Sequence, residues 1–297
     1  MRRFALLVLV CGCAARAAAQ SEGSVLPNLS GSTRMAAMGG VGVAILGDAA
    51  AIFDNPAGIA PVRHVSLEAS FEPYLAGTNY TTAALALRLG QFNWGVGGQT
   101  LDYGSEPVVV GGTPTGETFH AVDLLGTTSL VYRRGIFALG GGATYARQDI
   151  GLAPVSTWAG NVGLGADVFE ILEFGVSVLN LGGDFGNGST LGRRTRAGFT
   201  TNYVNPQATY HWLATVEGEW PEGAPAQLLV GLEGGLGSRS VGVTGRIGYA
   251  TRSPTSAESR WSVGGGLRVG KVNLDYAYQT YNLVGGPTHR VGMRWST

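Results

Sequence analysis

The residues that could carry chemistry are scattered along the sequence rather than grouped. The four histidines, His64, His120, His211 and His289, are far apart and show no spacing typical of metal ligands. No G-x-S-x-G motif is present, and the positions of the serines, histidines and aspartates suggest no catalytic triad. We therefore expect these histidines to be polar loop and strand-end residues, and we predict no metal site and no enzymatic activity.

Nucleotide binding and acid–base catalysis have no better support. The glycines between Gly39 and Gly47 form no G-x-G-x-x-G motif, and Lys271 belongs to no phosphate-binding loop. Glu217 and Glu219 are interpreted as wall residues that face water and arginines rather than as an acid/base pair. No basic block of the kind that binds nucleic acid stands out. The prediction is no cofactor and no nucleic-acid partner.

Residues 1–19 have the form of a cleavable signal peptide. A basic start is followed by an apolar stretch at residues 4–10 and by the small side chains of Ala17–Ala19. We predict cleavage after Ala19 and export, with a lipoprotein signal around Cys11 and Cys13 as the alternative. Because both cysteines lie in this leader, the mature chain would have no disulfide, thiolate metal site or cysteine nucleophile.

After about residue 62, short segments alternate apolar and polar residues. Strands that separate lipid from a polar barrel interior have this period of two. Trp261 and Val263, for example, share one face of a segment, while Arg260 and Arg268 share the other. The predicted strands are residues 65–74, 80–89, 92–101, 119–133, 136–148, 157–167, 174–181, 195–203, 210–220, 227–235, 241–250, 260–269, 271–279 and 288–296.

The predicted fold is all-β: a transmembrane antiparallel β-barrel of about 14 strands, formed by residues 62–297, in the bacterial outer membrane. Connections after even-numbered strands are mostly tight and those after odd-numbered strands mostly longer, including a loop at 102–118. Short turns are therefore assigned to the periplasmic side. The residues predicted to line the lumen have roughly balanced charges: Glu68, Arg88, Arg196, Glu217, Glu233, Arg246, Arg268, Asp275, Arg290 and Arg294.

Residues 20–61 differ from the strands that follow. Their stretch at residues 32–60 is rich in alanine and glycine and shows no alternation, and the many inward-facing glycines of the barrel leave room for it. We predict that residues 20–61 form an N-terminal plug or hatch in the lumen. Its motif consists of Asp48 followed by Asn55, Pro56, Ala57 and Gly58, in which an Asx side chain bonds nearby backbone and proline fixes φ.

This motif, together with Arg34-Met35 and Gly39-Gly40, resembles the N-terminus of the PorV/PorQ family of outer-membrane proteins, which are related in architecture to the FadL-type hydrocarbon transporters. Later segments resemble the same family: residues 71–77, 101–104, 179–183, 274–278 and 288–291. The resemblance implies a fourteen-stranded barrel that is linked to type IX secretion in organisms that have it. Relatives in this family carry cargo from the secretion channel or work with surface attachment.

Three functions are consistent with these expectations. The leading one is a non-enzymatic accessory or cargo-docking component of type IX-like protein secretion, whose partners would be secretion-channel proteins or secreted cargo. The alternative is a FadL-like channel for the uptake of hydrophobic small molecules, with the plug as its hatch. A barrel with a structural role only is the third. Outer-membrane lipids are a partner in all three.

Overall fold

The computed structural model describes residues 21–150, 153–169, 171–205, 207, 209–238, 240–252, 258–281 and 286–297. The predicted signal peptide at residues 1–19 lies outside the described residues. Within these ranges, no helix combines the length and the apolar character needed to cross a bilayer.

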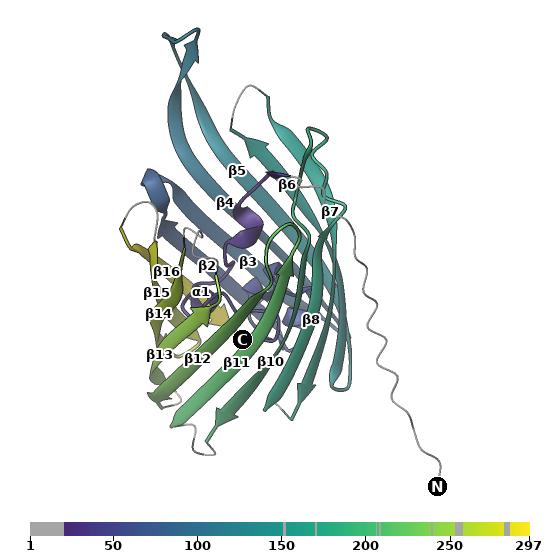
Figure 1. Ribbon diagram of the computed structural model, residues 1–297. Coiled ribbons are helices and arrows are strands. Elements are labelled where there is room, and N and C mark those ends of the chain that lie inside the picture. The colour runs from purple at the N-terminus through teal and green to yellow at the C-terminus, as the bar shows by residue number, and fades with distance from the viewer. Residues whose placement is uncertain are drawn as a thin grey trace.

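Across the described ranges, fourteen antiparallel strands close into a barrel (Figure 1), which confirms the predicted all-β barrel fold. Neighbouring strands pair in chain order, β8 pairs with β10, and β16 closes the barrel on β2. The barrel strands are β2 (Val65–Pro73), β3 (Asn79–Leu89), β4 (Phe92–Val110), β5 (Thr113–Arg134), β6 (Phe137–Asp149), β7 (Val155–Val168), β8 (Leu172–Leu181), β10 (Arg194–Val204), β11 (Tyr210–Pro221), β12 (Gln227–Gly237), β13 (Val241–Ala250), β14 (Glu258–Val269), β15 (Val272–Tyr281) and β16 (Thr288–Ser296).

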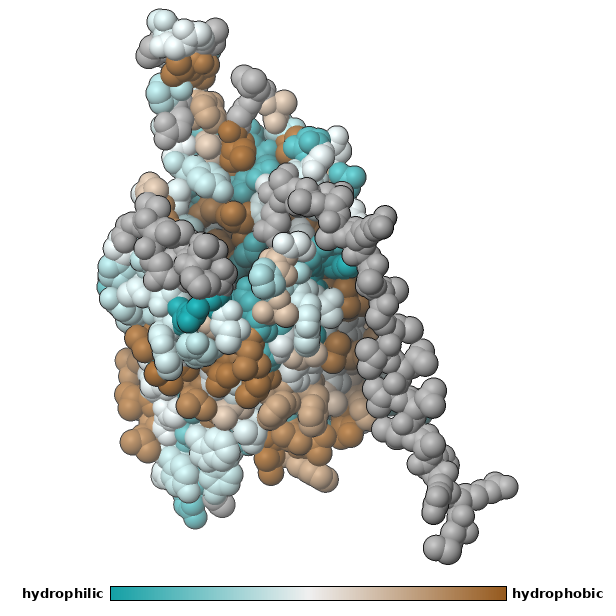
Figure 2. Space-filling model, viewed as in Figure 1, coloured by the Kyte–Doolittle hydropathy of each residue, from teal (hydrophilic) through white to brown (hydrophobic). Residues whose placement is uncertain are grey.

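Alternation along each strand separates an apolar outer face from a polar inner face. On β2, Glu68 and Glu72 are buried inside the barrel, whereas Leu67 and Phe71 are each 43% exposed on the outside. Hydrophobic residues gather mainly over the lower part of the wall in Figure 2, and hydrophilic residues predominate toward its upper end. Closure gives every strand of the barrel a paired neighbour on both sides, the arrangement that a hydrocarbon environment requires of β-structure.

The two ends of the barrel differ in their connections. At one end, which we call the turn end, the connections have two to five residues: 90–91, 135–136, 169–171, 205–209, 238–240 and 270–271. The chain enters β2 and leaves β16 at this end, where the Thr297 N–H donates to the Val65 carbonyl at 3.0 Å. Longer connections, such as 182–193 and 251–257, lie at the other end, which we call the loop end. In outer-membrane barrels the end with the longer connections is the extracellular one, so we expect this of the loop end.

The prediction of a loop at residues 102–118 is wrong. These residues continue β4 and β5 as a paired hairpin, which projects beyond the rest of the barrel in Figure 1 and turns at Gly111 and Gly112. The pairing register shifts between Asp102 and Gly104 and again between Pro107 and Val109. The first shift places one extra residue in β4 and moves the side chains that follow it to the opposite face, and the second places two extra residues in β5. The regular pairing is interrupted at both.

Residues 23–62, here called the inner segment, run inside the barrel from the loop end to the turn end (Figure 1). At the loop end, β1 (Ser21–Glu22) pairs in parallel with β9 (Ser189–Thr190), and Leu26 packs among residues of β3, β4 and β5. At the turn end, Asn93 Nδ2 of β4 donates to the Val62 carbonyl at 2.9 Å. The inner segment contains four short helices: η1 (Leu26–Asn28), α1 (Thr33–Ala36), η2 (Ala49–Phe53) and η3 (Pro56–Ile59). A further short helix, η4 (Leu75–Gly77), lies outside the inner segment, between β2 and β3.

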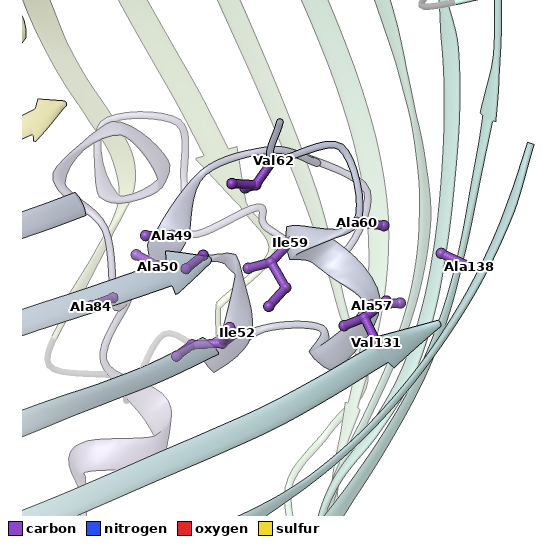
Figure 3. Packing of buried hydrophobic residues seen from close by; sticks show 11 residues of the cluster. Ala49, Ala50, Ile52, Ala57, Ile59, Ala60, Val62, Ala84, Val131 and Ala138 are labelled. Atoms are coloured by element: carbon purple, nitrogen blue, oxygen red, sulfur yellow. The ribbon is translucent and has the colours of Figure 1, made fainter. Parts of the chain in front are cut away.

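Small residues on both sides allow the inner segment to lie close to the wall. A Cβ added to Gly140 of β6 would stand 2.5 Å from the Ala57 amide nitrogen, and one added to Gly231 of β12 would stand 2.8 Å from the Met38 Cβ. Figure 3 shows an apolar cluster in which Ile52 and Ile59 of the inner segment lie among small wall residues such as Ala84, Val131 and Ala138. The core of the molecule is therefore inside the barrel, between the inner segment and the wall.

Candidate functional site

Six charged side chains form a closed cycle in the lumen, which we call the ion-pair ring: Arg34, Asp48, Glu233, Arg246, Asp275 and Arg294. Two members belong to the inner segment. Arg34 Nη1 lies 2.8 Å from Asp48 Oδ2, and its Nε and Nη2 donate to the two oxygens of Glu233 at 2.8 and 2.7 Å. Arg34 thus forms a bidentate bridge from α1 to β12, the geometry in which guanidinium–carboxylate pairs are strongest.

The wall residues complete the cycle. Arg246 Nε lies 2.6 Å from Glu233 Oε2, and its Nη1 lies 2.7 Å from Asp275 Oδ1. Arg294 Nε lies 2.6 Å from Asp275 Oδ2, and its Nη1 returns to Asp48 Oδ1 at 2.9 Å. Glu233, Arg246, Asp275 and Arg294 come from β12, β13, β15 and β16, so the ring ties the inner segment to one side of the barrel.

The ion-pair ring is neutral and largely buried. Exposed fractions of its side chains range from 1% for Asp275 to 17% for Asp48. Burial opposes ionisation of Asp48, but the guanidinium groups of Arg294 and Arg34 outweigh it and hold the pKa of Asp48 below its usual value. A buried ion pair adds little net stability over an apolar contact, whereas removing one partner is costly. The ring is therefore sensitive to changes at any member.

A second charged cluster centres on Arg196 of β10. Its guanidinium bridges Asp54 of the inner segment and Glu217 of β11, and its Nη2 donates to the Gly40 carbonyl at 2.6 Å. Glu217 Oε2 in turn accepts from the backbone N–H groups of Gly42 and the following residue at 2.8 and 3.0 Å. Two wall residues predicted as lumenal thus hold two separate stretches of the inner segment.

The Asn55 motif folds as a turn with a side-chain cap. Asn55 Oδ1 accepts from the Ala57 N–H at 2.9 Å, which caps η3. Its Nδ2 donates to the Val43 carbonyl at 2.8 Å and to the Leu164 carbonyl of β7 at 3.0 Å. Asn55 therefore links two stretches of the inner segment to the wall, and Pro56, Ala57 and Gly58 are buried in the helix that follows.

Two further residues predicted as lumenal face the inner segment. Glu68 of β2 is buried inside the barrel. Arg290 of β16 donates through Nη1 to the Ser30 carbonyl at 2.6 Å, and its guanidinium carbon lies 4.9 Å from the centre of the Tyr80 ring. A cation over an aromatic face is a favourable arrangement.

Arg88 and Arg268, also predicted as lumenal, lie outside these clusters. Both are at the turn end, where Arg88 Nε donates to the Gly90 carbonyl at 3.1 Å and Arg268 Nη2 donates to the Ser238 carbonyl at 2.7 Å. Alternation indicates which face of a strand a residue is on, but not how far along the barrel axis it lies. Because Arg88 and Arg268 lie beside predicted tight turns, the sequence could have placed them at the end of the barrel.

Three charged residues of these clusters were not predicted as site residues: Arg194, Arg34 and Asp54. Arg194 Nε lies 2.6 Å from Oε1 of Glu219, a wall residue that was expected to face arginines. Arg194 lies two residues from Arg196, so the same alternation could have identified it. Arg34 and Asp54 are in the inner segment, where no periodicity exists to indicate the direction of a side chain.

A cavity of about 310 Å³, here called the outer cavity, lies between the inner segment and the loop ends of the strands. Gly39, Gly40 and Asp54 of the inner segment line it, together with residues from β2, β3, β10, β11, β12, β15 and β16. Apolar and aromatic groups such as Leu29 and Tyr74 alternate with charged ones around its surface. This cavity and the ion-pair ring are the two features of the lumen from which a function can be argued.

Comparisons with known proteins give structural matches only. No family model matches the chain, and no curated protein matches it. The TodX deltaS2S3 mutant monoaromatic hydrocarbon channel superposes with a TM-score of 0.61 at 11% identity, covering 90% of this chain and 99% of its own. The CymD monoaromatic hydrocarbon channel gives 0.59 at 12%, covering 93% and 99%. The toluene transporter TbuX of Ralstonia pickettii gives 0.52 at 14%, covering 90% and 98%.

At these identities the similarity concerns the fold. The chain shares the barrel fold of these channels over 90–93% of its length. This matches the FadL-like architecture expected from the sequence. The PorV/PorQ resemblance finds no support among these structural neighbours and stays a prediction.

Proposed function

We propose that the protein is a non-enzymatic outer-membrane channel for the uptake of hydrophobic small molecules, with the inner segment as its hatch. The observation that carries the proposal is the attachment of the inner segment inside a closed barrel. Ion pairs at Arg34, Asp48 and Asp54 join it to the wall on one side. Such contacts can be exchanged for water when a segment moves, because the separated charges are solvated again.

The structural neighbours favour this function over a role in secretion. TodX and CymD are described as monoaromatic hydrocarbon channels and TbuX as a toluene transporter. Identities of 11–14% establish a shared fold, and we extend the hydrophobic class of substrate to this chain as a proposal. The hatch would be the inner segment, which corresponds to the plug predicted at residues 20–61, and the conduit would be the barrel predicted at residues 62–297.

Deletion of Met35–Ala60 tests the hatch. The lipid-facing strands are unchanged in this variant, so it should insert and remain heat-modifiable on gels. We expect higher single-channel conductance in planar bilayers than for the full chain, and faster entry of a hydrophobic fluorescent dye into cells. An inserted deletion variant with unchanged conductance and dye entry would contradict the proposal.

The β4–β5 hairpin gives the secretion role a specific observation of its own. Residues 103–121 pair only with each other, beyond the last pairs with β3 at Asp102 and β6 at Val122. A hairpin with two free edges at the extracellular end could present a surface to a secreted protein or a secretion channel. Replacing residues 105–118 by a short glycine turn should then abolish surface delivery of cargo while leaving dye entry unchanged. Unchanged delivery would remove this second candidate.

A further inference from the structure

We propose that the outer cavity binds a small amphipathic molecule whose head group is uncharged and forms hydrogen bonds, in preference to a plain hydrocarbon or an ion. This inference rests on the proposed channel function and names the class of molecule that its entry site selects. It follows from the balance of charge around the cavity, from the neutral amides in its wall, and from its size.

The charged groups at the outer cavity cancel. The four guanidinium groups are those of Arg194, Arg196, Arg252 and Arg290, and the four carboxylates are those of Asp54, Glu72, Glu217 and Glu219. Arg194 Nη2 lies 2.5 Å from Glu219 Oε1, and Arg290 Nη1 lies 3.9 Å from Glu72 Oε2. Arg196 forms ion pairs with both Asp54 and Glu217. Seven of these residues line the cavity, and Glu217 lies behind Arg196.

Because the charged groups of the cavity wall are already paired and their charges cancel, they contribute little binding free energy to an ionic ligand. An anion approaching Arg194 or Arg196 also approaches the carboxylates that already hold them, so attraction and repulsion nearly cancel. The anion must still lose its hydration to enter, which is costly without a partner of its own. The same argument applies to a cation near Glu219.

A neutral polar group is better matched. Gln227 and Gln279 line the cavity, and an amide can both donate and accept hydrogen bonds without charge. A hydroxyl group can likewise accept from a guanidinium N–H and donate to a carboxylate oxygen, and so fits between paired charges. A plain hydrocarbon would instead displace water from these groups and leave them without partners.

The rest of the cavity suits a compact apolar body. Leu29 and Leu229 line it, and the Tyr74 and Tyr281 rings meet edge to face with their centres 5.6 Å apart. An apolar cavity of about 150 Å³ holds benzene. The 310 Å³ here therefore has room for one ring with a short polar substituent.

Three compounds with the same ring separate the possibilities: toluene, benzyl alcohol and benzoate. Binding of each to the full chain in lipid nanodiscs is measured by ligand-observed NMR, with empty nanodiscs as the control. Benzyl alcohol should bind about tenfold more tightly than toluene or benzoate, the effect of about one well-formed hydrogen bond. Equal binding of benzyl alcohol and toluene, or tighter binding of benzoate, would overturn the inference.

Two variants locate the effect. Gln279→Leu should weaken benzyl alcohol binding and leave toluene binding unchanged, whereas Gln207→Leu, the same substitution at the turn end, should change neither. Glu219→Gln removes one carboxylate and leaves the cavity with a net positive charge, so benzoate binding should rise about tenfold. A Glu219→Gln protein with no gain for benzoate would contradict the charge argument.

The outcomes also separate this inference from the channel proposal. If the Met35–Ala60 deletion raises conductance but no compound binds above the empty nanodiscs, the hatch stands and the ligand class is wrong. If benzyl alcohol binds as expected but the deletion leaves conductance and dye entry unchanged, the cavity is a binding site and the channel proposal fails.

Discussion

Replacing Arg34 by methionine tests whether the ion-pair ring keeps the inner segment in the lumen. Methionine is similar in length and in helix propensity, so α1 should still form. The substitution removes three hydrogen bonds, one to Asp48 and two to Glu233. Because Arg34 belongs to the inner segment, the change leaves every strand of the wall intact.

The size of the effect follows from what the two carboxylates retain. Removing one partner of a buried ion pair typically costs about 3–5 kcal/mol, because the other is left unpaired. In the Arg34→Met protein, Asp48 still pairs with Arg294 and Glu233 still pairs with Arg246, so neither carboxylate is left without an ion-pair partner. We therefore expect the lower value, about 3 kcal/mol, which raises the population with a displaced inner segment roughly a hundredfold.

Single-channel recording in planar bilayers measures that population as the fraction of time spent conducting. Arg88→Met is the matched control, since Arg88 is an exposed arginine at the turn end, outside the ring. Both proteins should show the same heat-modifiable migration, because the barrel is unchanged. An Arg34→Met protein that conducts no more than Arg88→Met would refute the reasoning, since the ring would then contribute nothing to closure.

Three further predictions concern orientation, packing and pH. Val25→Cys should react with an impermeant maleimide on intact cells and Lys271→Cys only after lysis, because they lie at opposite ends of the barrel; the reverse would invert the orientation. Gly140→Ala should lower thermal stability by about 1–3 kcal/mol through its contact with Ala57, whereas Gly141→Ala, with nothing within 4 Å of the added Cβ, should not; equal effects would contradict the packing. Since the pKa of Asp48 is lowered in the folded state, its contribution is complete above about pH 4 and is lost as pH falls through the lower folded value. Conductance should therefore rise only in strongly acidic solution, and an Asp48→Asn protein with the same acid response would contradict this assignment.

The fold could be predicted because the membrane imposes one rule on every strand. Lipid outside and polar groups inside produce a period of two, and the fourteen strands were found from it. The rule fails where its physical cause ends. Beyond Asp102 the β4–β5 hairpin leaves the barrel, and register shifts near Gly104 and Val109 interrupt its pairing. No lipid constrains those residues, so the sequence shows no alternation there.

The candidate site was only partly predictable, for a related reason. Alternation placed Glu233 and Arg246 on the inner face, but their partner Arg34 is 199 positions from Glu233 in the sequence. A contact at that separation depends on how the inner segment threads the closed barrel, and no local pattern encodes it. The same holds for Asp54 and Arg196, which are 142 positions apart.

The apolar cluster of Figure 3 and the ion-pair ring lie on opposite sides of the barrel. The apolar cluster of Figure 3 joins η2 and η3 to β3, β5 and β6, whereas the ion-pair ring joins the inner segment to β12, β13, β15 and β16. Met35 and Met38 add apolar contacts near the ring, with Leu213 and Leu229. When water enters, exposed apolar side chains gain no interaction that replaces their lost contacts, whereas separated charges are stabilised by hydration. Opening is therefore expected to begin at α1 and the ring, with η2 and η3 still held against the opposite wall, so that the same segment can return and close the lumen.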